Sequence, residues 1–99
     1  MVVGVLVADL LLGDVHSLKQ KRGVIRPVIA ELRKRFEVAA AETGDADLHR
    51  RAEVSVSLVG TSHTHVRDVL AACERLLAER PELQLLSART RVLDDDDLD

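Results

Sequence analysis

An almost unbroken apolar segment, residues 2–12, is the feature that most constrains how this chain of 99 residues folds. The segment is rich in valine and leucine, and β-branched residues favour strands. A strand that is apolar on both faces is typical of the centre of a sheet. Asp9 marks the odd-numbered positions as the wetter face, so we expect the even-numbered positions to point into the core. The sequence therefore predicts a sheet built around this segment.

The remaining residues supply an aliphatic core. Phe36 is the only aromatic residue, and Cys73 is the only cysteine, so no internal disulfide can form. A chain of this length buries roughly 60–70% of its unfolded surface, which suits one domain. We therefore expect a single domain over residues 1–93 and a mobile acidic tail over residues 94–99.

Two amphipathic helices are expected from apolar residues at helical spacing. The first spans residues 17–35 and opens with a capping-box serine. Pro27 lies inside it, so we expect either a kink near Gly23 or a short basic first turn that is separate from the helix proper. The second spans residues 62–80 and ends before Pro81.

Three further strands are expected over residues 36–42, 52–58 and 83–93. The strict alternation in residues 52–58 indicates a half-buried strand. The order β-α-β-β-α-β predicts an α+β, ferredoxin-like sandwich: a four-stranded antiparallel sheet of order 4-1-3-2 with both helices on one face. In the last strand, one face is expected to hold Leu86, Ala88, Thr90 and Val92, and the other Ser87, Arg89 and Arg91.

Positive charge is concentrated in residues 17–35, which hold seven bases and one acid, whereas the whole chain carries −3. This asymmetry indicates local contact with an anionic partner rather than a general nucleic-acid coat. The cations at the end of the helix complement its dipole, but those near its start oppose the dipole at about 0.3–1 kcal/mol each. We therefore predict an anion or nucleic-acid site near the helix start, with a solvated helix face as the alternative. Its residues are Lys19, Lys21, Arg22 and Arg26, with Arg89 and Arg91 as a second patch on the outer sheet face.

Several short segments resemble the YlxP-like family, small bacterial proteins of undetermined function with a ferredoxin-like fold. The resemblance extends from about Val3 to Leu93. The segments that carry it are S-L-K-x-K-R from Ser17, R-x-R-F from Arg33, Asp47-Leu48 with Arg51-Ala52, and His65. Genes of this family often lie among those for transcription elongation, translation initiation and small-subunit maturation. The resemblance therefore implies the fold and, by analogy, a role near RNA or the ribosome. This chain departs from the family in having His49 where many relatives carry tryptophan, and apolar Val7 and Leu11 where relatives often carry charge.

The sequence contains no recognisable catalytic or metal-binding pattern. His63 and His65 lack further ligands at metal-binding spacing, and Cys73 falls on a core stripe. We therefore predict no catalytic residue, metal or cofactor, and a protein that is not an enzyme. A pocket gathering the candidate interaction residues His49, Arg51 and His65 would reopen the enzyme hypothesis.

Two functional hypotheses follow from these patterns. The first is a non-enzymatic accessory protein that contacts structured RNA or a ribosomal particle through the basic helix. The second is a homodimeric protein-interaction or small-ligand-sensing module that uses the apolar outer sheet face of Val3, Val5, Val7 and Leu11.

The segment before Asp9 lacks a basic region and a cleavage site, which predicts a cytoplasmic protein without a membrane anchor. We also predict that the acidic tail, residues 94–99, can fold back onto the basic helix.

Overall fold

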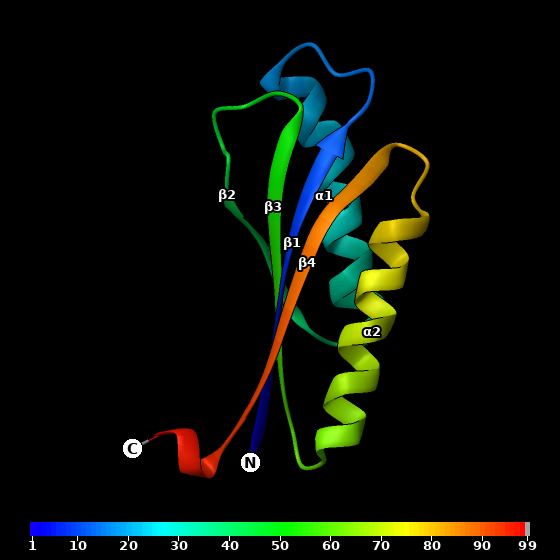
Figure 1. Cartoon of the computed structure of the whole chain (residues 1–99). Helices are drawn as coiled ribbons and strands as arrows, with labels where there is room; N and C mark the ends of the chain where they lie inside the picture. Colours follow the sequence, from blue (N-terminus) through cyan, green and yellow to red (C-terminus); the bar gives the residue numbers. More distant parts are fainter. Residues whose placement is uncertain (99) are drawn as a thin grey trace.

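The computed structural model describes residues 1–98 as one sheet with two helices and a short final 3-10 helix. The elements are β1 (Val2–Leu12), α1 (Leu18–Phe36), β2 (Ala39–Gly44), β3 (Arg51–Gly60), α2 (His63–Glu79), β4 (Leu83–Asp94) and η1 (Asp95–Leu98). All neighbouring strands are antiparallel, in the order β2-β3-β1-β4, which is the predicted order read from the opposite edge. Both helices lie on the same side of this sheet (Figure 1). The predicted ferredoxin-like α+β sandwich is confirmed.

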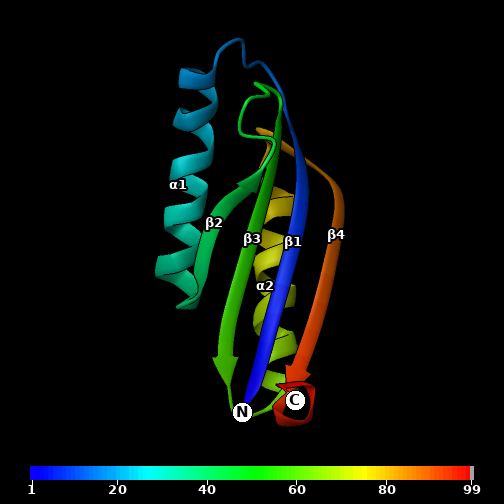
Figure 2. The same cartoon turned by 90° about the vertical axis from the view of Figure 1, so that its left-hand side faces the viewer.

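β1 lies at the centre of the sheet and divides its residues between two environments. Its even-numbered residues are buried beneath the helices, and its odd-numbered residues are half-buried on the other face, as the position of Asp9 predicted. Val5 pairs with Ser57 on one side and with Arg91 on the other. Figure 2 looks onto this second face, which neither helix covers. We call it the open face.

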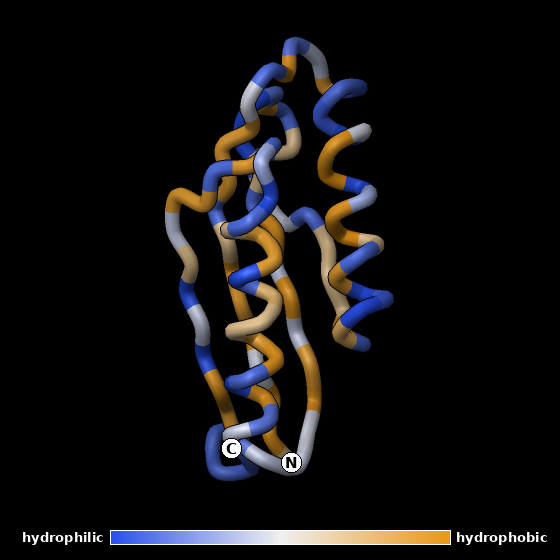
Figure 3. Tube along the Cα trace, turned by 90° about the vertical axis from the view of Figure 1, so that its right-hand side faces the viewer, coloured by the Kyte–Doolittle hydropathy of each residue, from blue (hydrophilic) through white to orange (hydrophobic). Residues whose placement is uncertain are grey.

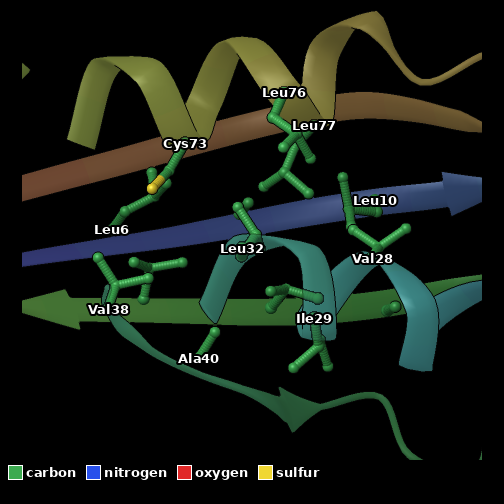
Figure 4. Packing of buried hydrophobic residues seen from close by; sticks show 14 of the residues in the cluster. Leu6, Leu10, Val28, Ile29, Leu32, Val38, Ala40, Cys73, Leu76 and Leu77 are labelled. Atoms are coloured by element: carbon green, nitrogen blue, oxygen red, sulfur yellow. The ribbon is translucent and has the colours of Figure 1, made fainter. Parts of the chain in front are cut away.

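The core fills the space between the two helices and the covered face of the sheet. Both helices alternate between hydrophilic and hydrophobic residues along their length, as amphipathic helices must (Figure 3). Figure 4 shows Leu32 from α1 and Leu77 from α2 projecting toward β1, where Leu6 and Leu10 lie. All four side chains are fully buried. The core is aliphatic, as the composition indicated.

Because of the turn after α1, the second strand begins later in the sequence than predicted. Glu37 adopts a left-handed conformation with φ of 53°, and its N–H donates to the carbonyl of Arg33. This cap ends the helix by a mechanism that normally favours glycine or asparagine, so the sequence did not signal it. β2 therefore begins at Ala39, three residues later than the predicted strand over 36–42.

A β-bulge in β4 overturns one predicted face assignment. Ser87 pairs with Asp9, but the next partner of β1 is Leu85, so Leu86 is an extra residue. Leu86 is consequently 41% exposed and does not share the helix-covered face with the residues that follow it. Beyond the bulge the prediction is correct, because Thr90 and Val92 pair with Leu6 and Gly4, which belong to the helix-covered face of β1.

α1 is continuous through Pro27, so the expected separate first turn is wrong. Pro27 lacks the N–H that would bond to the carbonyl of Gly23. Both residues are exposed, and water can satisfy that carbonyl. The helix therefore tolerates the proline.

The acidic end of the chain lies beside the N-terminus, not beside the basic helix. Asp95 pairs with the Met1 amino group at 3.0 Å, and Asp97 accepts a hydrogen bond from the N–H of Asp94. Figure 1 shows the N-terminus and η1 at the opposite end of the sheet from the start of α1. The structure thus does not place the tail on the basic helix, and Asp99 lies outside the described residues. Within residues 1–98, neither helix combines the length and apolar character needed to cross a membrane.

Candidate functional site

The structure removes Lys21 from the predicted anion-binding surface. Its side chain is only 2% exposed, although it belongs to the basic first half of α1. The ammonium donates to the carbonyl oxygens of Asp45 at 2.7 Å and Leu48 at 2.9 Å. It also forms an ion pair with Glu42 Oε2 at 2.7 Å. Lys21 therefore fastens the β2–β3 loop to the helix and cannot reach a phosphate in solvent.

The buried ammonium of Lys21 explains why two of the segments that carry the family resemblance occur together. Lys21 and Leu48 come from two of the segments that carry the family resemblance, and they meet directly through the Leu48 carbonyl. Asp45, whose carbonyl also accepts from Lys21, adopts a left-handed conformation with φ of 60°. The two segments are thus linked by a structural contact, and their pairing does not by itself indicate a binding site.

The other three predicted cations of α1 remain on the surface. Lys19, Arg22 and Arg26 are exposed, and none of them forms an ion pair with another residue in the part of the chain that the structure describes. The N-cap of Ser17, which accepts from the N–H of Gln20, fixes the helix start that presents them. These cations are available for a partner.

A groove of about 440 Å³ runs between α1 and the β2 edge of the sheet. Arg22, Arg26 and Arg33 line it, together with Glu42. Glu42 is already neutralised by Lys21, so the arginines dominate the charge of the groove. Arg33 also donates from Nε at 3.0 Å and from Nη2 at 2.6 Å to the carbonyl of Ala40. The groove therefore has a net positive lining, in which Arg33 is held in place by the backbone of β2.

The second predicted patch, Arg89 and Arg91, lies at the other side of the sheet. Both residues are exposed in β4, opposite Val7 and Val5 on the open face. β4 and β2 are the two opposite edges of the sheet. The structure consequently does not join this patch to the α1–β2 groove.

The candidate interaction residues do not form one pocket. His49 lies in the loop after β2, Arg51 begins β3, and His65 lies in the first turn of α2. The β2–β3 loop and the start of α2 are at opposite ends of the sheet (Figure 1). Within residues 1–98, no three His, Cys, Asp or Glu side chains are grouped to hold a metal ion.

Cys73 is enclosed by the core and is chemically quiet. Its side chain is fully buried, and burial raises the pKa of the thiol from 9.0 to about 11. A thiol with a raised pKa carries little thiolate at neutral pH, so it is a poor nucleophile. The residue behaves as a small apolar side chain, as its place on the helical stripe predicted.

Several structural arginines were not recognised from the sequence. Arg50 donates from Nε to the carbonyls of Leu12 and Gly13, both at 3.1 Å. Arg80 pairs with Glu31 and so links the end of α2 to α1. Arg33 lies in the last turn of α1, where it complements the helix dipole, and it also donates to the carbonyl of Ala40. Contacts across the fold of this kind leave no local sequence signal.

Two comparisons place the chain among proteins whose function is not established. A family model described as "Protein of unknown function (DUF503)" matches residues 3–90. An "Uncharacterized protein YlxP" from Bacillus subtilis (strain 168) is 24% identical over 88 residues, which cover 89% of this chain and 96% of that protein. These matches confirm the resemblance seen in the motifs, and neither description names an activity.

Proposed function

This chain belongs to the DUF503 family of proteins of unknown function, and we propose that it is a non-enzymatic accessory protein that contacts structured RNA or a ribosomal particle. The contact surface is the exposed start of α1 and the α1–β2 groove. Lys19, Arg22 and Arg26 bind phosphate groups along this surface.

The observation that carries this proposal is the state of Arg22 and Arg26. Both line the groove, both are exposed, and neither is paired with an acid among residues 1–98. No acid of the described residues accounts for either guanidinium, so contacts within the fold do not explain why both positions carry arginine. A phosphate partner gives them favourable bidentate contacts instead.

Recognition on this surface is of shape and phosphate rather than of bases. Phe36 is the only aromatic residue in the chain, so no row of aromatic side chains is available to stack bases. Binding through three phosphate contacts makes affinity strongly dependent on salt. The slope of log affinity against log salt is expected at about −2 to −3.

The first prediction is that Arg22→Gln with Arg26→Gln weakens binding to a structured ribosomal RNA fragment by roughly tenfold or more at moderate salt. The same double substitution should reduce the salt slope by about 1.5 to 2, because two phosphate contacts are lost. Fluorescence anisotropy over a salt series measures both quantities.

Lys34→Gln with Arg35→Gln is the matched control. It removes the same charge from the same helix, but neither residue lines the groove. Equal weakening by the two double variants would show that only overall charge matters and would contradict the proposed site. Absence of a salt slope in the unmodified protein would contradict phosphate binding altogether.

A second candidate function is supported by the open face. Val3, Val5, Val7 and Leu11 lie together along β1, half-buried and without a covering helix. An apolar stripe at the centre of a sheet face is typical of a protein-interaction surface. We propose a homodimer, packed sheet to sheet through this face, as the alternative role of this domain.

A further inference from the structure

The fold contains a second groove, between α2 and the edge strand β4, which corresponds in position to the groove between α1 and the edge strand β2. Arg22 lies five residues after the N-cap Ser17, and Arg67 lies five residues after the N-cap Ser62. The α2–β4 groove has a volume of about 510 Å³, with an apolar floor that includes Leu70. Arg67 and Arg75 line it from the helix side.

The strand edges that border the two grooves differ in one decisive respect. β2 has six residues, and Arg33 occupies the carbonyl of Ala40 on that strand. β4 has twelve residues, and it pairs with β1 on one side only. Among the described residues, no side chain hydrogen-bonds to the backbone of residues 84–93. β4 therefore presents a long row of free N–H and C=O groups.

Arginines flank this free edge on both of its faces. Arg67 and Arg75 lie on the helix side of β4, and Arg89 lies on the open face. Arg91 pairs with Val5 on the open face and also lines the groove. None of these four has an ion-pair partner within residues 1–98. Among residues 1–98, Glu74 is the one acid that lines the groove. The middle of the edge is thus surrounded by a net positive charge, whereas its end at Asp94 is acidic.

We propose that β4 receives an acidic, extended peptide segment of a partner protein as a fifth strand. The backbone of such a segment pairs with the free edge, while its alternating side chains reach the arginines on the two faces. A peptide suits this groove better than a nucleic acid, because one wall is a strand edge whose hydrogen-bonding groups repeat at the spacing of a β-strand. Facing copies of Arg89 and Arg91 oppose most registers in which β4 would pair with a second copy of itself.

The test uses the full chain and a capped synthetic peptide of about nine residues built from Val-Glu-Glu repeats, which puts glutamates on both faces of a strand. Binding is followed by NMR chemical shifts and by hydrogen exchange of backbone amides. Slowed exchange is expected in residues 84–93, together with at least tenfold weaker binding after Arg67→Gln with Arg75→Gln. Arg22→Gln with Arg26→Gln, the matched change in the other groove, should leave peptide binding unchanged.

Three outcomes would overturn the proposal. The first is equal binding by the same peptide with its backbone N-methylated at alternate residues, since pure charge attraction needs no strand pairing. The second is tighter occupation of the α2–β4 groove by a single-stranded RNA oligonucleotide. The third is protection of β4 amides that rises with protein concentration without peptide, since that identifies a second copy as the occupant.

Discussion

Lys21 shows how one side chain can change the meaning of a charge cluster. In sequence it stands among exposed cations, but its position relative to Ile25, Val28 and Leu32 puts it on the buried stripe of α1. The long aliphatic stem crosses the helix surface, and the ammonium finds two carbonyls and one carboxylate at its end. Sequence spacing could have shown that Lys21 is buried, but its partners come from a loop more than twenty residues away.

The second prediction is that Lys21→Met destabilises the fold by about 2–4 kcal/mol. The substitution leaves Glu42 without its counter-ion and leaves the carbonyls of Asp45 and Leu48 without their donor. Glu42 is 26% exposed, so water offsets part of the loss and the effect falls below that of a fully buried pair. Urea unfolding of the variant measures the change.

The double variant Lys21→Met with Glu42→Leu tests the mechanism. It should recover part of the lost stability, because no unpaired carboxylate remains. If the single variant is as stable as the unmodified protein, Lys21 does not hold the loop and is again a cation available to bind a partner.

The third prediction concerns the pH dependence of stability at Cys73. Because burial raises the pKa of the thiol to about 11, the unfolded chain releases this proton first, near its ordinary pKa of 9.0. Stability from this group is therefore unchanged below pH 9 and falls between pH 9 and pH 11, by about 1.4 kcal/mol per pH unit. Urea unfolding between about pH 8 and pH 10.5 measures the decline.

Cys73→Ala supplies the reference for this measurement. It lacks the thiol but keeps every other side chain of the protein. The difference in stability between the two proteins should therefore shrink as the pH rises above 9. Parallel curves for the two proteins would show that the thiol is not desolvated.

At the scale of elements, the strands with regular alternation were the most predictable. The pattern of β1 and the alternation of β3 reflect local period and gave the correct buried faces. The β4 bulge and the left-handed cap at Glu37 depend on pairing and packing elsewhere in the fold, so neither was foreseen. The grooves were missed for the same reason, because each joins a helix to a strand distant in sequence.

The fourth prediction is that Gly23→Ala stabilises α1 by about 1 kcal/mol. Gly23 lies inside the helix without a positive φ, and an added Cβ would meet no atom within 4 Å. For a domain of this size the melting temperature should rise by about 4–8 °C, which thermal unfolding by circular dichroism measures.

Gly4→Ala is the opposing case in the same experiment. Its added Cβ would overlap Cγ1 of Val66 and lie 3.0 Å from Cδ1 of Leu70. Overpacking of this kind costs about 1–3 kcal/mol. An unchanged melting temperature in Gly23→Ala would indicate that the helix near Pro27 is distorted enough to need glycine.

At the scale of the whole molecule, the fold separates its surfaces by location. The α1–β2 groove and the α2–β4 groove lie along opposite edges of the sheet, and the open face lies between those edges. A phosphate partner in the first groove therefore does not compete for residues with a peptide on β4 or with a second copy on the open face. The peptide and the second copy do share Arg89 and Arg91, which belong both to the rim of the open face and to the peptide-binding edge.

The fifth prediction is that the protein dimerises through the open face at tens of micromolar. A sheet-to-sheet dimer buries the valines of β1 against their copies, with Arg89 and Arg91 at its polar rim. Val5→Thr with Val7→Thr keeps the strand propensity of both positions but removes apolar area, and two-fold symmetry doubles the loss. Sedimentation equilibrium should show a dissociation constant at least tenfold higher in this variant.

Leu48→Glu provides the control for the dimer experiment, because its side chain is 51% exposed in the β2–β3 loop, away from the open face. It should leave the dimer unchanged. A clean monomer in the unmodified protein at these concentrations would contradict the dimer and leave the stripe along β1 exposed to solvent. In that case RNA binding through α1 would still be testable, since its two arginines lie on a different side of the molecule from the open face.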